Sequence, residues 1–163
     1  ALYLAGGPNE NGSFRTIHIR RGNRVVRTVD LYDFLLRADQ KDNILLHDGD
    51  VIHVPDFLAH VEVDGEVRRP MLYEVKQGET LRDVITFAGG FTDRAYTATL
   101  SLARNTPRER RIANVTPDEL ATMAPQSGDK LTVGEILKRY ENLVSVKGAV
   151  FRPGPYALEP GTS

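Results

Sequence analysis

An internal repeat constrains this sequence more than any other feature. Residues 143–163 match residues 60–80 at an offset of 83 positions, and eight of the 21 aligned positions are identical. The identical positions are Val61/Val144, Val63/Val146, Gly65/Gly148, Val67/Val150, Arg69/Arg152, Pro70/Pro153, Tyr73/Tyr156 and Gly78/Gly161. At the same offset, residues 1–21 align with residues 84–104. Self-similarity at a fixed period is the signature of a tandem array of one structural unit.

A further match, at a slightly different offset, pairs residues 49–54 with residues 128–133. Residues 1–58 therefore correspond to the back part of a first unit, residues 59–134 to a complete unit, and residues 135–163 to a linker and the front hairpin of a further unit. We expect the chain to be a piece of a longer array, because both of its ends fall inside the repeat. A unit this small buries a modest core, so neighbouring units are expected to pack against each other.

The complete unit begins with the pattern of a β-hairpin. Val61, Val63 and Val67 alternate with charged residues, which predicts a half-buried strand. Pro70 has no amide hydrogen to donate within a central strand, so it is expected to separate this strand from a second one over residues 72–75.

A helix is predicted to follow the hairpin. Thr80 and Asp83 resemble a capping box, and Gly89 and Gly90 end the helical spacing with a left-handed cap. Strands are then expected over residues 97–103, 111–115 and 130–133, with a helix from Thr116 to Met123 between the last two. The first unit is expected to repeat this helix over residues 31–36, capped by Asp30, and the last strand over residues 51–54. The order predicts an α+β fold of tandem β-grasp (ubiquitin-like) units, each a small mixed sheet wrapped over a helix.

Composition excludes several classes of function. The 163 residues include 21 Lys and Arg against 22 Asp and Glu, a net charge of −1, whereas a dedicated nucleic-acid binder usually carries a basic excess. The absence of cysteine removes disulfides, thiolate metal sites and a cysteine nucleophile. No apolar run approaches the roughly 18 residues of a membrane-spanning helix.

Neither catalysis nor a metal or cofactor site is expected. The histidines His18, His47, His53 and His60 are isolated and lack the spacing of metal ligands. Asp48-Gly49-Asp50 predicts a turn rather than a calcium loop. The serines lack a nucleophile elbow, and the carboxylates are scattered without a cleft implied by the sequence.

Three arginines are candidates for ligand or interface contacts. Arg69 and Arg152 recur at one hairpin corner, beside Arg68. An arginine there either packs its aliphatic stem over an edge strand or donates to a carboxylate of a neighbouring subunit. A second basic stretch, residues 104–111, is expected to be a solvated loop or to contact an anionic glycan or a neighbouring subunit, because it lacks the interleaved aromatics of a nucleic-acid motif.

The hairpin-and-helix pattern resembles the soluble-ligand-binding β-grasp (SLBB) domain of Wza-like outer-membrane polysaccharide export proteins. The residues that carry it are Val61, Val63, Gly65, Val67, Arg69, Pro70, Tyr73, Val75, Gly78, Thr80, Leu81, Ala88, Gly89 and Gly90. Met71 departs from the glycine that this family often has and that the later copy keeps as Gly154.

The resemblance implies a non-catalytic periplasmic module of a capsular or exopolysaccharide export channel, located in the cell envelope and shaping the conduit by ring-like homo-oligomerisation. The implied partners are the polysaccharide in transit and the inner-membrane copolymerase and export machinery, with no nucleic acid and no cofactor.

The alternative is a soluble module that binds a saccharide or another small ligand. Aromatic residues make up 7% of the chain and tryptophan is absent, which disfavours a sugar-stacking pocket. A DNA-uptake protein that carries the same domain is disfavoured by the lack of a basic motif.

Overall fold

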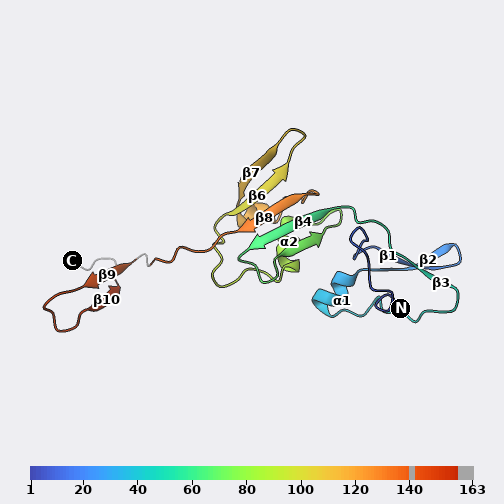
Figure 1. Ribbon diagram of the computed structural model, residues 1–163, viewed down its shortest axis with the longest axis horizontal. Coiled ribbons are helices and arrows are strands. Elements are labelled where there is room, and N and C mark those ends of the chain that lie inside the picture. The colour runs from blue at the N-terminus through green and yellow to red at the C-terminus, as the bar shows by residue number, and fades with distance from the viewer. Residues whose placement is uncertain (140–141, 158–163) are drawn as a thin grey trace.

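The computed structural model describes residues 1–139 and 142–157, and the last part of the predicted further unit, residues 158–163, lies outside the described residues. In the described residues, ten strands form three separate sheets and are accompanied by three short helices (Figure 1), in agreement with the predicted α+β class. None of the helices in the described part of the chain is long and apolar enough to span a membrane.

The central sheet has five strands in the order β5-β4-β8-β6-β7. Their bounds are β4 (His60–Gly65), β5 (Met71–Glu74), β6 (Leu100–Asn105), β7 (Arg110–Val115) and β8 (Asp129–Val133). Strands β4 and β8 run parallel, and every other neighbouring pair is antiparallel. The first and last strands of this region therefore meet in the middle of the sheet, which closes residues 60–133 into one folding unit.

One face of the central sheet is covered by α2 (Leu81–Phe87). The inward strand residues Val61, Val63 and Leu131 are fully buried, as are Leu81 and Val84 of the helix. The predicted alternation thus places the apolar residues of β4 in the core and leaves its acidic residues outside.

Both predicted helix starts are confirmed, since Thr80 with Asp83 and Thr116 with Glu119 form complete capping boxes. Two predicted lengths are wrong. The helix α3 (Pro117–Leu120) has one turn and does not reach Met123, because its carbonyls are capped by tight turns. Strand β6 begins at Leu100 instead of residue 97, because residues 95–96 bridge to residues 134–135 instead of β8.

The N-terminal sheet has three strands in the order β2-β1-β3, namely β1 (Ile17–Arg21), β2 (Arg24–Val29) and β3 (Asp50–His53). Helix α1 (Leu31–Arg37) follows β2, and Asp30 caps it through the amide of Tyr32, as predicted. A third, two-stranded sheet is the C-terminal hairpin, β9 (Leu143–Val146) and β10 (Gly154–Ala157). Figure 1 shows this hairpin extended away from the central sheet, on the side opposite the N-terminal sheet.

The sequence repeat is reproduced in atomic contacts. In the N-terminal sheet, Arg21 Nε and Nη2 donate to the two carboxylate oxygens of Asp50 at 2.8 and 2.9 Å. In the central sheet, Arg104 makes the same two-pronged contact with Asp129 at 2.9 and 2.7 Å. Each aspartate follows the glycine of the predicted turn, so the pair ties that turn to the first strand of the neighbouring hairpin.

The β4–β5 and β9–β10 hairpins, which begin successive repeats, each contain the same side-chain hydrogen bond. The hydroxyl of Tyr73 donates to the carbonyl oxygen of Arg69 at 2.6 Å, and that of Tyr156 donates to the carbonyl oxygen of Arg152 at 2.6 Å. This contact closes the corner between the paired strands in both copies.

Candidate functional site

The N-terminal and central sheets are joined by a buried ion cluster around Arg15. Arg15 lies two residues before the start of β1, and only 5% of its surface is exposed. Its guanidinium carbon lies 4.7 Å from the ring centre of Tyr32 in α1 and 4.7 Å from that of Phe87 in α2. A guanidinium held over aromatic faces gains cation–π attraction, which is stronger where water is excluded.

Two carboxylates share this guanidinium, namely that of Asp30, which caps α1, and that of Glu79, which precedes α2. Nη1 and Nη2 of Arg15 donate to Glu79 at 2.6 and 2.7 Å, a two-pronged contact to the turn before α2. Nε and Nη2 donate to Oδ2 of Asp30 at 3.2 Å, and Lys76 Nζ donates to the same oxygen at 2.7 Å. Nη1 also donates to the carbonyl oxygen of Glu74 at 3.2 Å. The cluster therefore links α1, which follows the N-terminal hairpin β1–β2, to the β4–β5 hairpin and α2 of the central unit.

A second buried acid completes the junction. The Glu74 carboxylate accepts hydrogen bonds from the Ser13 hydroxyl at 2.6 Å and from the Phe14 amide at 2.7 Å. The Glu74 amide donates to the Tyr32 hydroxyl at 2.8 Å. Among the described residues, no buried side-chain nitrogen or oxygen lacks a hydrogen-bond partner. A fully satisfied buried polar network fixes one relative orientation of its parts.

The electrostatics of the junction favour its charged form. Burial opposes the charge of Arg15, but hydrogen bonds to Glu79 and Asp30 outweigh it and raise the pKa of Arg15. Burial likewise opposes ionisation of Asp30, and hydrogen bonds from Lys76 and Arg15 nevertheless lower the pKa of Asp30. Burial raises the pKa of Tyr32 to about 12, which keeps its hydroxyl protonated. None of these three groups titrates near neutral pH, so the arrangement suits holding two sheets together and not proton transfer.

The junction is expected to weaken only in acid. Because the folded-state pKa of Asp30 lies below the unfolded value of about 3.9, its stabilising contribution is complete above that value. The contribution is lost as pH falls through the lower folded-state pKa. Asp30→Asn keeps a side chain that can cap α1 but removes the charge. The melting temperature of the wild type should exceed that of Asp30→Asn by a constant margin from pH 7 to 5, and the margin should shrink below about pH 4. A margin that stays unchanged down to pH 3 would contradict this assignment.

The three arginines proposed from the sequence lie at hairpin corners and make none of the hydrogen bonds of this ion cluster. The Arg69 guanidinium donates to the carbonyl oxygen of Phe87 at 3.1 Å, where it caps the end of α2. The side chains of Arg68 and Arg152 make no hydrogen bond to the described residues, and both residues are exposed. An interface or ligand role for these three arginines stays a prediction.

Sequence reasoning missed Arg15 and its partners. The repeat held a signal, because Arg15 and the helix cap Asp30 align with Ala98 and with the later cap Thr116. A charged pair that is present in one copy and absent from the next points to a contact specific to one junction. Only the three-dimensional arrangement brings Glu79, which lies 64 positions away from Arg15 in the sequence, into that contact.

The other motifs have structural roles. Asp48 and Gly49 form the predicted turn, and Asp50 begins β3 and accepts the His47 amide at 2.9 Å. Gly89 and Gly90 follow α2 with φ of +81° and +83°, as expected. The basic stretch is a β-hairpin instead of a loop, because Arg104 and Arg111 are paired across β6 and β7.

The histidines are less isolated than the sequence indicated, since the rings of His18 and His53 stack across β1 and β3 with centres 6.1 Å apart. Even so, the residues that the structure describes hold no group of three or more potential metal ligands.

Comparisons with known proteins match the central part of the chain. A family model, described as the SLBB domain, matches residues 60–113. Two curated Escherichia coli proteins, each described as the polysialic acid transport protein KpsD, are 31% identical to this chain over 110 residues. The match covers 68% of this chain and 18% of each relative. The part of this chain that matches therefore corresponds to less than a fifth of the length of each relative.

Proposed function

Residues 60–113 of this chain are an SLBB domain, and from this premise we propose that the chain is a non-catalytic module of a capsular or exopolysaccharide export channel. The observation that carries the proposal is the similarity to KpsD, which extends over 110 residues and so beyond the 54 residues of the domain match. KpsD is described as a transport protein for polysialic acid.

The geometry supports a structural role within such a channel. We infer that the strand order β5-β4-β8-β6-β7 with α2 across one face is a β-grasp unit, and that the N-terminal sheet and the C-terminal hairpin are parts of further units in tandem. The Arg15 cluster makes the junction between two consecutive units stiff, since all three guanidinium nitrogens are engaged. A stiff series of small units can set the length and curvature of a conduit wall without performing chemistry.

The finer parts of the proposal concern place and partners. The module would lie in the periplasm as part of an outer-membrane-associated protein, assemble into a ring-like homo-oligomer, and pass polysaccharide delivered by the inner-membrane copolymerase and export machinery. Arg68 and Arg152 are suited to donate to a neighbouring subunit or to the polymer, because their guanidinium groups are exposed and make no hydrogen bond to described residues. Arg69 would contribute chiefly by fixing the corner that presents Arg68.

An exchange experiment in Escherichia coli tests the role in export. The segment of KpsD that matches this chain is replaced by the corresponding 110 residues, and polysialic acid on the cell surface is measured with a specific antibody. We expect the exchanged protein to keep surface polymer, and the same protein carrying Gly65→Val, which disrupts the central sheet, to lose it. Loss of surface polymer with a stable, normally localised exchange protein would contradict the proposal.

The purified chain separates this role from the alternative and from catalysis. We expect no release of sialic acid from polysialic acid, since the described residues hold no group of three or more potential ligands for a catalytic metal ion and the sequence has no nucleophile elbow. We also expect no saturable binding of short saccharides. Tight saturable binding of such a saccharide would favour the soluble ligand-binding module instead.

A further inference from the structure

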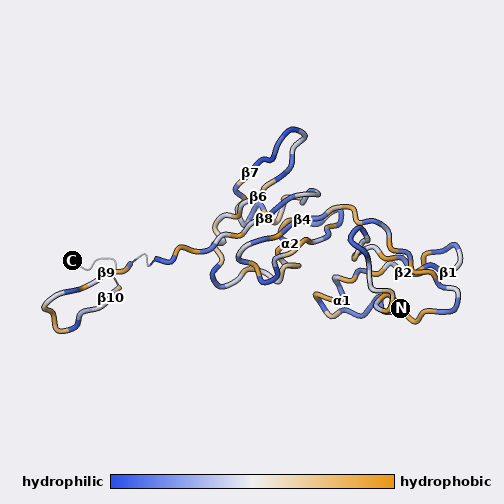
Figure 2. The backbone as a smooth tube through the Cα atoms, in the orientation of Figure 1, coloured by the Kyte–Doolittle hydropathy of each residue, from blue (hydrophilic) through white to orange (hydrophobic). Residues whose placement is uncertain are grey.

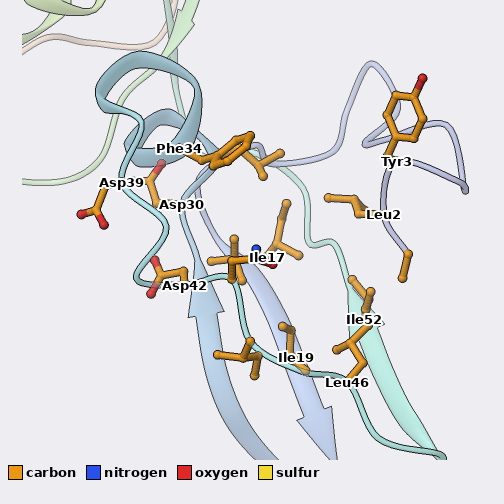
Figure 3. Close-up of a pocket in the computed structure, with 15 residues that line it drawn as sticks. Leu2, Tyr3, Ile17, Ile19, Asp30, Phe34, Asp39, Asp42, Leu46 and Ile52 are labelled. Carbon is orange, nitrogen blue, oxygen red and sulfur yellow. The ribbon is translucent and has the colours of Figure 1, made fainter.

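The outer face of the N-terminal sheet carries a pair of histidines. His18 of β1 lies directly opposite His53 of β3, and their rings are nearly parallel, with an angle of 7° between the planes and 6.1 Å between the centres. Figure 3 shows the neighbouring residues Ile17, Ile19 and Ile52 directed into a cavity on the other face of the sheet. Because successive side chains of a strand point to opposite faces, the two histidines face away from that cavity.

The two imidazole rings are accessible from solvent. His53 is exposed and His18 is half-buried, whereas Ile17 and Ile19 on the other face are buried. In Figure 2 the strands of this sheet carry both hydrophobic and hydrophilic stretches, as is usual for an antiparallel sheet with one face on the core and the other in water. A dissolved ion can therefore reach the ring nitrogens without any opening of the core.

A hydrogen bond across the sheet orients the ring of His18. Its Nδ1 lies 3.1 Å from Oγ1 of Thr28, the residue opposite it in β2. When Nδ1 carries the proton and donates it to Thr28, Nε2 keeps a free lone pair. Neither Nε2 of His18 nor either ring nitrogen of His53 hydrogen-bonds to a residue in the described part of the chain. A hydrogen bond to the second ring nitrogen is the usual support of a metal-binding histidine.

The separation of the rings fits one shared metal ion. Imidazole nitrogens bind Zn²⁺ at about 2.0–2.1 Å, which places the centres of two imidazoles on a common ion at most about 6.5 Å apart. The observed 6.1 Å lies within that limit. The pairing of β1 with β3 keeps the two backbones adjacent, so rotation of the side chains alone directs one nitrogen of each ring to the ion.

Both histidines depart from the repeat. At the equivalent positions, the central sheet has Ser101 in β6 and Thr132 in β8, which are paired across the two strands in the same way. Both are only half-buried, although the central sheet is complete, so this face is accessible in a whole unit as well. The histidine pair is therefore a feature of one unit, and not of the fold that the two units share.

We propose that His18 and His53 form a binding site for a divalent metal ion that prefers nitrogen ligands, namely Cu²⁺, Ni²⁺ or Zn²⁺. One nitrogen of each imidazole binds the ion, and water fills the remaining positions. Imidazole suits these metals, whereas Mg²⁺ and Ca²⁺ prefer oxygen ligands. The bound ion joins β1 to β3 and stabilises the N-terminal sheet, because an ion that binds only the folded state shifts the folding equilibrium toward it.

Titration of the purified chain with Cu²⁺, in the absence of a histidine tag, tests the site by calorimetry. Cu²⁺ is the probe because it binds such ligands more tightly than Ni²⁺ or Zn²⁺, and the chain has no cysteine that could compete. We expect one ion per chain, and at least tenfold weaker binding by His18→Ser and by His53→Thr. Both substitutions introduce the residue that the central sheet has at the equivalent position, so they suit the fold. The matched control is His47→Ser, at an exposed position outside the strands, and it should bind like the wild type.

The converse substitutions are expected to build a second site. Ser101→His combined with Thr132→His places the same pair on the central sheet, in the register that joins β6 to β8. We expect this double variant to bind two Cu²⁺ ions per chain. In the wild type, Cu²⁺ should slow hydrogen exchange in β1 and β3 alone, whereas in this variant it should also slow exchange in β6 and β8.

Two results would overturn the proposal. If the wild type binds Cu²⁺ no more tightly than the double variant His18→Ser/His53→Thr, the metal is adventitious. If either single variant keeps the wild-type affinity, the two rings do not share one ion. The export role proposed above does not depend on either outcome, since the site lies on a face of the sheet that the role does not use.

Discussion

Replacing Arg15 with methionine is expected to uncouple the N-terminal sheet from the central sheet. The substitution keeps an apolar stem between Tyr32 and Phe87 but leaves the Glu79 carboxylate without its cation, whereas Asp30 keeps Lys76. Removing one partner of a buried ion pair costs about 3–5 kcal/mol, because the remaining charge stays buried without compensation. Hydrogen exchange should show faster exchange for the amides of β1–β3, while those of β4 and β8 keep their protection.

An exposed ion pair provides the matched control for this substitution. Arg94 contacts Glu66 at 3.2 Å, and 61% of the Arg94 side chain is exposed. Arg94→Met should cost at most about 1 kcal/mol, because solvent screens such pairs. In addition, the double variant Arg15→Met/Glu79→Gln should lose less free energy of unfolding than the sum of the losses in the two single variants, since both substitutions remove the same contact. If Arg15→Met is as mild as Arg94→Met, the cluster does not hold the sheets together.

Much of the fold follows from local sequence patterns. The alternation of Val61 and Val63 predicted a strand with one buried face, and the spacing of Thr80 and Asp83 predicted a helix start, because both signals act within a few residues. Each of these local signals is weak alone, but their recurrence at the same spacing in successive repeats made the prediction specific. Strand order was not accessible in the same way, since the parallel pairing of β4 with β8 joins segments almost 70 residues apart.

The candidate site was less predictable, for a physical reason. Arg15 and Glu79 carry charges that a sequence usually places on the surface, and their burial depends on the docking of two sheets. The arginines chosen by their repetition, Arg69 and Arg152, occupy one hairpin corner in each copy. Repetition therefore identified what each unit needs internally, whereas the contact between units involves residues that the repeat does not keep.

Replacing Gly65 with alanine is expected to disrupt the central sheet. Gly65 has φ of +83°, and a Cβ added there would lie 2.0 Å from the carbonyl oxygen of Val133. That oxygen cannot retreat easily, because it accepts the Glu66 amide at 3.0 Å and belongs to the strand paired with β4. The left-handed conformation alone costs a non-glycine residue about 1–2 kcal/mol. With the clash added, we expect a loss of at least about 3 kcal/mol, the upper end of ordinary substitutions.

Gly78→Ala separates the two causes of this loss. Gly78 lies in the same unit with φ of +89°, but an added Cβ would meet nothing within 4 Å. It should therefore show only the conformational cost of about 1–2 kcal/mol. The difference between the two variants in urea unfolding measures the close approach of β4 to β8. Equal losses would mean that the strands separate readily at this point, and the parallel pairing that closes the central unit would then contribute little to its stability.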